Sequence, residues 1–594
     1  MRLRAWPLAP LLAAALAACG GTPGGSTAPA PGPTLGSLGT DTAYAGAASA
    51  AIQASGAGTQ CFDQDGSDEI TVLWEGHALA TSAGLCAADA IVPAADLATP
   101  GAYQVTVEDG AGRTSSGLPF YVLPAAQADA AVRLLVSANL SGQPDDGANN
   151  SAPAISATGR YVAFQSLADD LVPGPASGYA DIYVRDTCLG APSPCTPSTI
   201  RASVATGGAL ANGHSYDPTI SADGRYVAFD SNATNLAAGV PAASPTVHPV
   251  YLRDTCIGAP SACTPSTILV SVTPAGSFAT GDEPSLSATG GYLAMIGAPA
   301  LAGSTVAGDI PAIVRDTCIG AVSPCLPGNL LASANGSGQL ADYGGASYVR
   351  ISPDGRYVVF SSSADNLDPS ATNHMPHIYL RDTCIGAAAG CVPSTTLVDV
   401  GSDGQPANGH GDSNIDFPAV SAGGRYVAFS SAADVTNLGG APNHGDLYLR
   451  DTCNGAPAGC TPATTVISVP YSGQFSNSGS DSASMTPDGR YIAFASLATN
   501  LVLDDPSQLN SSKDIFVRDT CNGAPAPCTP VTTWASVANW PNQPYQPSYS
   551  ACSGPAISAD GHYVAYLSDS GAYSLAIGVA SNGSTQVYLA TTGF

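Results

Sequence analysis

ISADGRYVAF at residues 220–229 is the clearest of seven related segments in this 594-residue chain. The other copies are ISATGRYVAF (155–164), LSATGGYLAM (286–295), ISPDGRYVVF (351–360), VSAGGRYVAF (420–429), MTPDGRYIAF (485–494) and ISADGHYVAY (557–566). The copies start 65 to 72 residues apart, a period that suits one four-stranded propeller blade with long loops. The repeat therefore predicts seven blades built on one scaffold.

Each copy is interpreted as part of a four-stranded unit. In the copy at 220–229, an inner strand PTIS and a second strand RYVAF flank a tight Asp-Gly turn, which is a common hairpin connection. VYLRD (250–254) is predicted to form the third strand and TILVSV (267–272) the outer strand. With 66 Gly, 48 Pro and no sustained helical periodicity, the whole chain is predicted to be all-β.

The last copy is incomplete, because QVYLATTGF (586–594) ends after the third strand. The missing strand resembles RLLVSA at residues 133–138, which precedes the first copy. We predict that residues 133–138 complete the last blade and close the ring, since closure removes exposed strand edges. The propeller is expected to span residues 132–594.

Twelve cysteines form six pairs with one spacing, each between a predicted third strand and the next outer strand. The pairs are Cys188/Cys195, Cys256/Cys263, Cys318/Cys325, Cys384/Cys391, Cys453/Cys460 and Cys521/Cys528. Cysteines that flank a hairpin loop can face each other across the ladder, within disulfide distance, so six local disulfides are predicted. Zinc binding is the alternative, but this spacing without interleaved His is poor for zinc.

An Arg-Asp pair precedes the first cysteine of each hairpin. These pairs are Arg185–Asp186, Arg253–Asp254, Arg315–Asp316, Arg381–Asp382, Arg450–Asp451 and Arg518–Asp519. A group that recurs at the same strand end in six units is interpreted as a hairpin cap or an ion-pair network rather than as a catalytic site.

The alternation of strand direction sorts the loops onto two faces. The turns after the first strands and the disulfide hairpins share one face, and the longer, variable loops share the other. Binding is expected on the variable face, because loops on a rigid scaffold carry specificity. There, Trp540, Tyr545 and Tyr549 in the loop 539–555 are predicted to contact a ligand, or else to pack over the seam between the last two blades.

Histidines are concentrated in the same predicted loops, namely His214, His248, His374, His377, His410 and His444. His410 and His444 are included among the candidate ligand-binding residues. A metal centre would need several imidazoles to converge, and the chain has no HxH or HExxH motif. We therefore predict no metal and no cofactor, with ordinary solvated loop histidines as the simpler interpretation.

The N-terminus has the pattern of an export signal. Arg2 and Arg4 precede a short apolar run, and the run ends in LAAC at Cys19. This pattern resembles the lipobox of bacterial lipoproteins, which implies a signal peptide at 1–19, acylation of Cys19 and, in a host with two membranes, anchoring to the outer one. Residues 20–35 are predicted to be a flexible tether, and the lipid is the only expected membrane contact.

The formal net charge is −27, and the chain has a single lysine, Lys513. Nucleic acid is therefore excluded as an expected partner, because binding phosphates requires clustered Lys and Arg.

Residues 36–123 contain no copy of the repeat and are predicted to form a separate domain, joined by a linker at 124–131. The strand-like segments EITVLW (69–74), AYQVTVEDGAG (102–112) and LPFYV (118–122) resemble an IPT/TIG immunoglobulin-like domain. Cys61 and Cys86 are expected to pair within it, which leaves Cys552 as the odd cysteine, either buried or paired between molecules. The acidic run DQDGSDE (63–69) either binds calcium or forms a surface turn.

SPDGRYVVF (352–360) and TPDGRYIAF (486–494) resemble the PD40 repeat of TolB-like propellers. The departures are seven units where TolB's own propeller has six, a disulfide in nearly every unit and the additional N-terminal domain. The leading hypothesis is a non-catalytic platform that binds an envelope protein or glycan, and the resemblance to TolB-like proteins favours a protein partner.

A carbohydrate-active enzyme, either a polysaccharide lyase or a hydrolase with its site at the mouth of the central channel, is the alternative. The chain has no GxSxG elbow and no SxDxGxTW box. A convergent cluster of His, Arg, Asp or Tyr at the mouth of the ring would favour the enzyme. A mouth of Gly, Ala, Ser and Asn would exclude it, and simple stabilisation of the envelope is a third possibility.

Overall fold

The computed structural model divides the chain into two compact units, Met1–Val122 and Leu123–Phe594. It describes residue 33 and residues 35–594 except 39–41, 45–48, 57–69, 84–86, 99–100, 111, 116, 124–132, 147–149, 242–247, 305–309, 322–323, 343–344, 372–373, 402–403, 408–417, 432–444, 471–475, 503–511, 526, 537–551 and 570–583. Strands and turns dominate the described residues, and the only helices there are two 3-10 turns, η1 (Pro299–Ala302) and η2 (Ala422–Gly424). The predicted all-β class is confirmed. Neither of these turns is long and apolar enough to cross a membrane.

The first unit contains two antiparallel sheets that share one core. One sheet has the order β1 (Leu35–Leu38), β3 (Ser49–Gly56), β7 (Ala87–Pro93) and β6 (Thr81–Ala83). The other has the order β2 (Thr42–Tyr44), β9 (Leu118–Leu123), β8 (Gly101–Asp109), β4 (Ile70–Trp74) and β5 (His77–Ala78). Ile52 and Val92 from the first sheet pack with Val72, Trp74 and Phe120 from the second. The alternating burial of β7 and the buried face of β4 supply this shared core.

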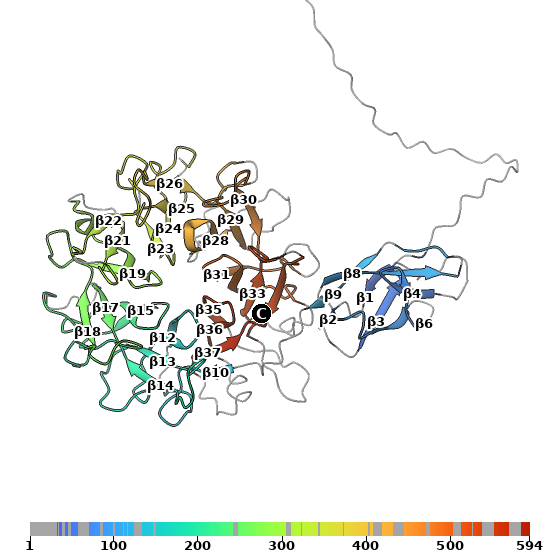
Figure 1. Ribbon diagram of the computed structural model, residues 1–594, viewed down its shortest axis with the longest axis horizontal. Helices are drawn as coiled ribbons and strands as arrows, with labels where there is room; N and C mark the ends of the chain where they lie inside the picture. Colours follow the sequence, from blue (N-terminus) through green and yellow to red (C-terminus); the bar gives the residue numbers. More distant parts are fainter. Residues whose placement is uncertain are drawn as a thin grey trace, which may run out of the picture. The chain divides into compact units, whose positions relative to one another are not determined.

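The second unit contains seven four-stranded antiparallel sheets (Figure 1). Sheet 1 comprises β11 (Ser151–Ile155), β12 (Tyr161–Ser166), β13 (Asp181–Asp186) and β14 (Ser198–Arg201); sheet 2 comprises β15 (Ser215–Ile220), β16 (Tyr226–Ser231), β17 (Val250–Asp254) and β18 (Ser266–Leu269). Sheet 3 comprises β19 (Gly281–Leu286), β20 (Tyr292–Gly297), β21 (Ala312–Asp316) and β22 (Asn329–Leu331); sheet 4 comprises β23 (Ser347–Ile351), β24 (Tyr357–Ser362), β25 (His377–Asp382) and β26 (Ser394–Leu397). Sheet 5 comprises β27 (Ala419–Val420), β28 (Tyr426–Ser431), β29 (Asp446–Asp451) and β30 (Ala463–Val466); sheet 6 comprises β31 (Ser480–Met485), β32 (Tyr491–Ser496), β33 (Asp514–Asp519) and β34 (Val531–Trp534).

Sheet 7 combines the two ends of this unit. Its strands are β35 (Cys552–Ile557), β36 (Tyr563–Ser568), β37 (Gln586–Thr591) and β10 (Arg133–Leu135). Arg133 pairs with Ala590 and Leu135 with Tyr588, antiparallel. The predicted outer strand at 133–138 therefore pairs as a ladder only over its first three residues, and Ala138 instead forms an isolated bridge with Pro144.

The Tyr of each repeat copy packs under the turn of the following sheet. Tyr161 of sheet 1 lies against Gly224 of sheet 2, where φ is +79°, so that a Cβ at Gly224 would overlap the ring. The same contact recurs for Tyr226/Gly290, Tyr292/Gly355, Tyr357/Gly424, Tyr426/Gly489, Tyr491/Gly561 and Tyr563/Gly159. The last of these pairs joins sheet 7 to sheet 1, where the Asp560 N–H also donates to the Ala157 carbonyl at 3.2 Å.

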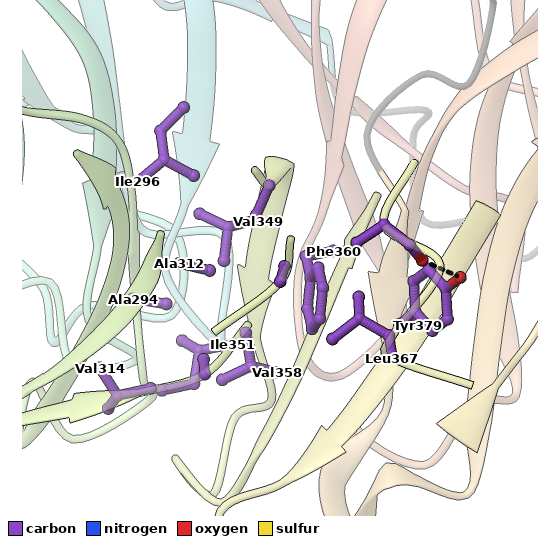
Figure 2. Close-up of a cluster of buried hydrophobic side chains, with 14 of the residues drawn as sticks. Ala294, Ile296, Ala312, Val314, Val349, Ile351, Val358, Phe360, Leu367 and Tyr379 are labelled. Carbon is purple, nitrogen blue, oxygen red and sulfur yellow. Dashed lines mark hydrogen bonds between the residues drawn. The ribbon is translucent and has the colours of Figure 1, made fainter. Parts of the chain in front are cut away.

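The seams between sheets are filled by aliphatic and aromatic side chains. Figure 2 shows Ala294 and Val314 of sheet 3 facing Val349, Ile351 and Val358 of sheet 4. The second and third strands supply most of these residues, because both of their faces are covered by neighbouring sheets and their central residues are fully buried. The inner strands of the sheets lie toward the middle of this circular arrangement (Figure 1).

Candidate functional site

One end of sheets 1 to 6 carries the repeated turn and the disulfide hairpin, and the same end of sheet 7 carries the turn alone; we call it the stapled end. In sheet 2, Arg225 of the repeat donates two hydrogen bonds to Asp254, at 2.9 and 2.7 Å, and its guanidinium lies 4.8 Å from the centre of the Tyr226 ring. Equivalent pairs are Arg160–Asp186, Arg356–Asp382, Arg425–Asp451 and Arg490–Asp519. The interpretation of the Arg-Asp aspartates as structural groups is supported by these contacts.

The same aspartate caps the hairpin, because Asp254 Oδ1 accepts a hydrogen bond from the Cys256 N–H at 2.9 Å. Partial burial acts to raise the pKa of Asp254, but the hydrogen bonds from Arg225 and from the Cys256 backbone outweigh it, and the pKa falls below its ordinary value. The neighbouring arginine, Arg253, bonds to Thr267 of the outer strand at 3.0 Å. These groups hold the third strand, the hairpin and the outer strand together.

All six repeat disulfides predicted from the spacing are present, with Cα–Cα separations of 5.7 to 5.8 Å. They join Cys188 with Cys195, Cys256 with Cys263, Cys318 with Cys325, Cys384 with Cys391, Cys453 with Cys460 and Cys521 with Cys528. Their sulfurs are bonded to each other and are therefore not available as zinc thiolates. Disulfides of this kind are typical of proteins that fold outside the cytoplasm.

The position of these cysteines relative to the ladder differs from the prediction, as sheet 6 shows. The last ladder pair between β33 and β34 is Asp519 with Val531. Cys521 and Cys528 both lie beyond that pair, inside the hairpin loop, and so do not face each other across the ladder. Cys521 has φ of 63°, and its N–H donates to Asp519 Oδ1 at 2.8 Å. The loop therefore turns at the first cysteine, and this turn places Cys528 within bonding distance.

The other cysteines are not part of the hairpins. Cys552 is a buried thiol. Cys19, Cys61 and Cys86 lie outside the described residues, as does the acidic run at 63–69.

The opposite end of sheets 2, 3 and 4 brings together several polar side chains, which we call the inner acidic cluster. Its members are Tyr216, Asp217, Asp230, His248, Asp282, Glu283 and Arg350. They come from the starts of β15 and β19, the inner strand β23, the end of β16 and the loop before β17. The cluster therefore lies at the end that carries the variable loops.

Local backbone geometry turns two of these carboxylates out of the regular ladder. The pairing of β15 with β16 is irregular between Tyr216 and Thr219, and Asp217 there has φ of 47°. The same irregularity in β19 gives Glu283 a φ of 51°. Bulges of this kind re-aim a side chain that would otherwise follow the alternation of the strand.

Asp230 and His248 form the centre of the cluster. Asp230 is fully buried, and its Oδ2 lies 3.0 Å from Nδ1 of His248, whose side chain is 29% exposed. Oδ1 of Asp230 is also buried and has no hydrogen-bond partner among the described residues. Burial raises the pKa of Asp230 to about 7, the hydrogen bond from His248 opposes that rise, and the charges of Asp217 and Asp282 add to it.

The charges of Asp217, Glu283 and Arg350 also affect one another's pKa values. Asp217 keeps solvent-accessible surface, yet the protein atoms crowded around its carboxylate raise its pKa, and the charge of Asp282 raises it further against the opposing charge of Arg350. Burial likewise raises the pKa of Glu283 despite Arg350 and the hydrogen bond from the Val349 N–H at 3.2 Å. Burial lowers the pKa of Arg350. Ionisation of the carboxyl groups of Asp217, Asp230 and Glu283 is therefore less favourable than in water.

A row of aromatic rings borders the cluster. The rings of Tyr216 and His248 are parallel within 3°, with centroids 5.2 Å apart. His214 stacks beside Tyr216 at 6.0 Å, and Tyr179 meets His214 edge-on at 5.2 Å. Nδ1 of His214 accepts the Ala180 N–H at 3.0 Å, and Tyr179 at the end of the row is 38% exposed.

The candidate ligand-binding residues from the sequence, Trp540, Tyr545, Tyr549, His410 and His444, all lie outside the described residues. The placement of His377 in a loop is wrong. It is the first residue of β25 and is buried, with Nδ1 2.7 Å from Asp399. His374 is exposed and forms an ion pair with Asp365 at 3.0 Å.

The carboxylates of the cluster were not among the residues predicted from the sequence. The sequence nevertheless contained two signals. Among the seven copies, only the copy at 220–229 is followed directly by Asp, which is Asp230. The strand starts SYDPTI (215–220) and GDEPSL (281–286) also carry acidic residues where the equivalent segment SGPAI (553–557) has small ones. Departure from the repeat marks the site more reliably than histidine content did. His214 and His248, which lie in the predicted loops, do take part in it.

No family model matches the chain, and no curated protein matches it either. Among solved structures, a puromycin-hydrolyzing peptidase of Mycobacterium tuberculosis is 12% identical with a TM-score of 0.34, over 90% of this chain and 61% of that one. Prolyl oligopeptidase B from Galerina marginata is 10% identical with a TM-score of 0.36, over 71% of this chain and 47% of that one. An alpha-L-arabinofuranosidase from Lactobacillus brevis is 13% identical with a TM-score of 0.27, over 52% of this chain and 92% of that one.

The chain thus spans less than two thirds of the length of the two peptidases. At these TM-scores none of the three likenesses carries an argument about the function of this chain.

Proposed function

We propose that residues 132–594 form a closed seven-bladed propeller of the TolB-like/PD40 type, held out from the cell envelope by an IPT/TIG-like domain and a lipid on Cys19. The pairing of β10 with β37 and the contact of Tyr563 with Gly159 support closure of the ring. The six disulfides support export. The LAAC sequence at 16–19 supports the anchor.

The function we propose for this propeller is recognition of a glycan at the inner acidic cluster. The observation that carries it is the cluster itself, in which Asp217, Asp282 and Glu283 converge beside an aromatic row. Carboxylates accept hydrogen bonds from sugar hydroxyls, and aromatic side chains supply an apolar wall with a polar edge. Small-molecule and saccharide sites combine these two kinds of group in a concave setting.

A protein ligand fits the cluster less well. Stable protein interfaces bury about 800 Å² on each partner around an apolar centre. The two most exposed aliphatic side chains of the described residues, Leu326 and Val392, lie instead in the disulfide hairpins of the stapled end. Leu140, in the connection between β10 and β11, is exposed as a single aliphatic side chain and is not a member of the cluster. The cluster contributes charge and rings but no exposed aliphatic side chain.

A glycan-binding screen with the purified protein tests this proposal. We expect retention on at least one class of neutral, acidic or amino glycan, and a loss of about tenfold or more in affinity for the Asp217→Asn/Asp282→Asn variant. The matched control is Asp223→Asn/Asp488→Asn, which removes the same charge from exposed turns of the stapled end. Binding to proteins of the envelope with no glycan retained would contradict the proposal.

The hydrogen bond between Asp230 and His248 favours a second candidate, a carbohydrate-active enzyme. A buried carboxylate that holds one ring nitrogen of a partly exposed histidine fixes its tautomer and orientation, as a general base requires. In this case His248 would accept the proton from the sugar, and Asp230 would act as a positioning residue.

Incubation of polysaccharides with the purified protein separates the two candidates. Release of reducing ends or unsaturated products, abolished in His248→Asn and reduced in Asp230→Asn with a changed pH profile, would establish the enzyme. Tight binding without any product, unchanged over long incubation, would leave recognition as the function.

A further inference from the structure

We propose that the inner acidic cluster recognises an ammonium group and that the glycan it binds is therefore an amino sugar polymer. This inference rests on the proposed glycan-binding function and specifies its substrate class.

The cluster has more negative than positive fixed charge. Asp217, Asp282 and Glu283 supply three carboxylates, and Asp230, whose pKa is raised to about 7, supplies a fourth that is partly protonated at neutral pH. The positive charges that act on Asp217 are those of Arg350 and, when it is protonated, His248. The parts of residues 123–594 that the structure leaves undescribed contain no Lys or Arg. The undescribed segments of this unit therefore add no lysine or arginine to the cluster.

Asp230 gives an independent indication of a missing partner. Its side chain is fully buried, with Oδ2 bonded to His248 and Oδ1 without a hydrogen-bond partner in the described part of the chain. Asp230 pairs across the ladder with Tyr216 on β15, and cross-strand partners point to the same face of a sheet. That face is directed at sheet 3, because Ala228, two residues earlier on β16, packs with Leu286 and Leu293. The orphaned oxygen therefore lies on the Asp282 side of the strand, and a buried acceptor of this kind is costly unless a donor or a cation reaches it.

An ammonium group on a sugar meets these requirements together. It carries positive charge and three N–H donors for several carboxylate acceptors. The sugar ring that bears it presents apolar C–H faces to the border formed by Tyr216, His214 and Tyr179. Neutral glycans satisfy the rings alone and leave the charge unbalanced.

The test compares oligomers of glucosamine and of N-acetylglucosamine of equal length, in which acetylation replaces the charged amine by a neutral and larger amide. Titration calorimetry at physiological ionic strength, where long-range attraction to the acidic protein is screened, is expected to show saturable one-to-one binding of the glucosamine oligomer. We expect the acetylated oligomer to bind about tenfold or more weakly.

Variants separate the cluster from the general acidity of the protein. Asp217→Asn/Asp282→Asn is expected to lose about tenfold or more in affinity for the glucosamine oligomer. Asp223→Asn/Asp488→Asn, with the same change in net charge at exposed turns, is expected to keep it. Equal losses in the two double variants would mean that the attraction is non-specific and would overturn the inference.

The remaining outcomes distinguish this inference from the function on which it rests. Equal or tighter binding of the acetylated oligomer, or of a neutral or acidic glycan, overturns the ammonium inference and keeps the proposed glycan-binding function. Binding of oligolysine with neither sugar retained overturns both, and so does binding of calcium alone.

Discussion

At one end of sheet 2 Asp254 accepts two hydrogen bonds from Arg225, and at the other end Asp217 and Asp230 crowd with a third carboxylate, Asp282. The pKa of Asp254 is lowered, whereas the pKa values of Asp217 and Asp230 are raised by burial and by their neighbours. Residues at the stapled end recur from sheet to sheet, and those of the inner acidic cluster do not. The stapled end therefore contributes stability, while the inner acidic cluster carries unbalanced charge that a ligand can neutralise.

The largest effect is expected for Gly224→Ala at the stapled end. The new Cβ would overlap the Tyr161 ring and occupy a left-handed conformation, which together cost about 3 kcal/mol or more. Gly258→Ala is the matched control in the same sheet, because φ there is +69° but no atom lies within 4 Å of the new Cβ. It should cost about 1 kcal/mol. Chemical denaturation measures the free energy of unfolding of both variants. Equal losses would show that the contact with the Tyr161 ring does not contribute to the effect.

A pH dependence of stability is expected at the variable end, where Asp145 accepts hydrogen bonds from Gln586 and Ser166. Burial raises its pKa from 3.8 to about 6. The folded protein therefore holds a proton between these values that the unfolded chain has released. The stabilisation is complete below pH about 4 and is lost as the pH rises through about 6.

The unfolding free energy of the natural protein should therefore fall by about 2 kcal/mol relative to Asp145→Asn between those two pH values. Thermal or denaturant unfolding across this range measures the difference. Parallel curves for the two proteins would show that Asp145 does not titrate in the folded state as its surroundings imply.

Removal of one disulfide tests the stapled end alone. Cys256→Ser/Cys263→Ser should lower the free energy of unfolding by about 2 kcal/mol, because the open hairpin has more freedom in the unfolded chain. Glycan affinity should not change, since the inner acidic cluster lies at the other end of the sheet. A loss of affinity in a variant that is still folded would break the separation between the two ends.

The smallest effects on stability are expected when Asp is replaced by Asn at either end of sheet 2. Asp254→Asn should destabilise the protein at neutral pH by about 1 kcal/mol or less, since it weakens a partly exposed ion pair. Because the pKa of Asp254 is lowered, this difference should vanish as the pH falls through that pKa.

Asp217→Asn should instead stabilise by a few tenths of a kcal/mol, after discounting for solvent exposure, because it removes a charge that burial and the charge of Asp282 disfavour. The raised pKa means that this gain should appear only as the pH rises into the range where Asp217 ionises. Melting curves of the two variants at the same pH values measure the signs. Melting-temperature shifts of the same sign in the two variants would show that the two ends of the sheet do not differ electrostatically as described.

Sequence periodicity was sufficient for the scaffold. The repeat placed the four strands of each sheet, the cysteine spacing placed the disulfides, and the resemblance of residues 133–138 to an outer strand located the partner of β37. These features are local or repeated, so one good copy informs the others. The shorter ladder of β10 was not visible, because the chain after Leu135 turns to bridge Pro144.

The spacing of the cysteines gave the pairing but not the local geometry. Cys521 and Cys528 were expected to face each other across the ladder, and they lie inside the hairpin loop instead. The loop turns through a positive φ at Cys521, a conformation that is uncommon for a residue with a side chain. Such a turn is therefore not predictable from the residue type.

The inner acidic cluster was harder to predict, because it depends on contacts across sheets. Asp230 and Asp282 are 52 positions apart, and only the packing of sheet 2 against sheet 3 brings their charges together. His377 was misplaced for a related reason. Its strand begins earlier than the repeat indicated, and a buried Asp399 satisfies the ring. Polar residues that replace small ones at inner-strand positions were the informative signal.

The cysteines of each disulfide are only seven positions apart and consecutive in the chain. A chain that enters an oxidising compartment from its N-terminus therefore presents each cysteine to its correct partner before any later cysteine arrives. Among these twelve residues no rearrangement of mispaired bonds is needed. In contrast, β10 enters first and must wait for β37, the last strand to arrive. In such a compartment the disulfides can therefore form hairpin by hairpin, whereas β10 can pair only after β37 has arrived.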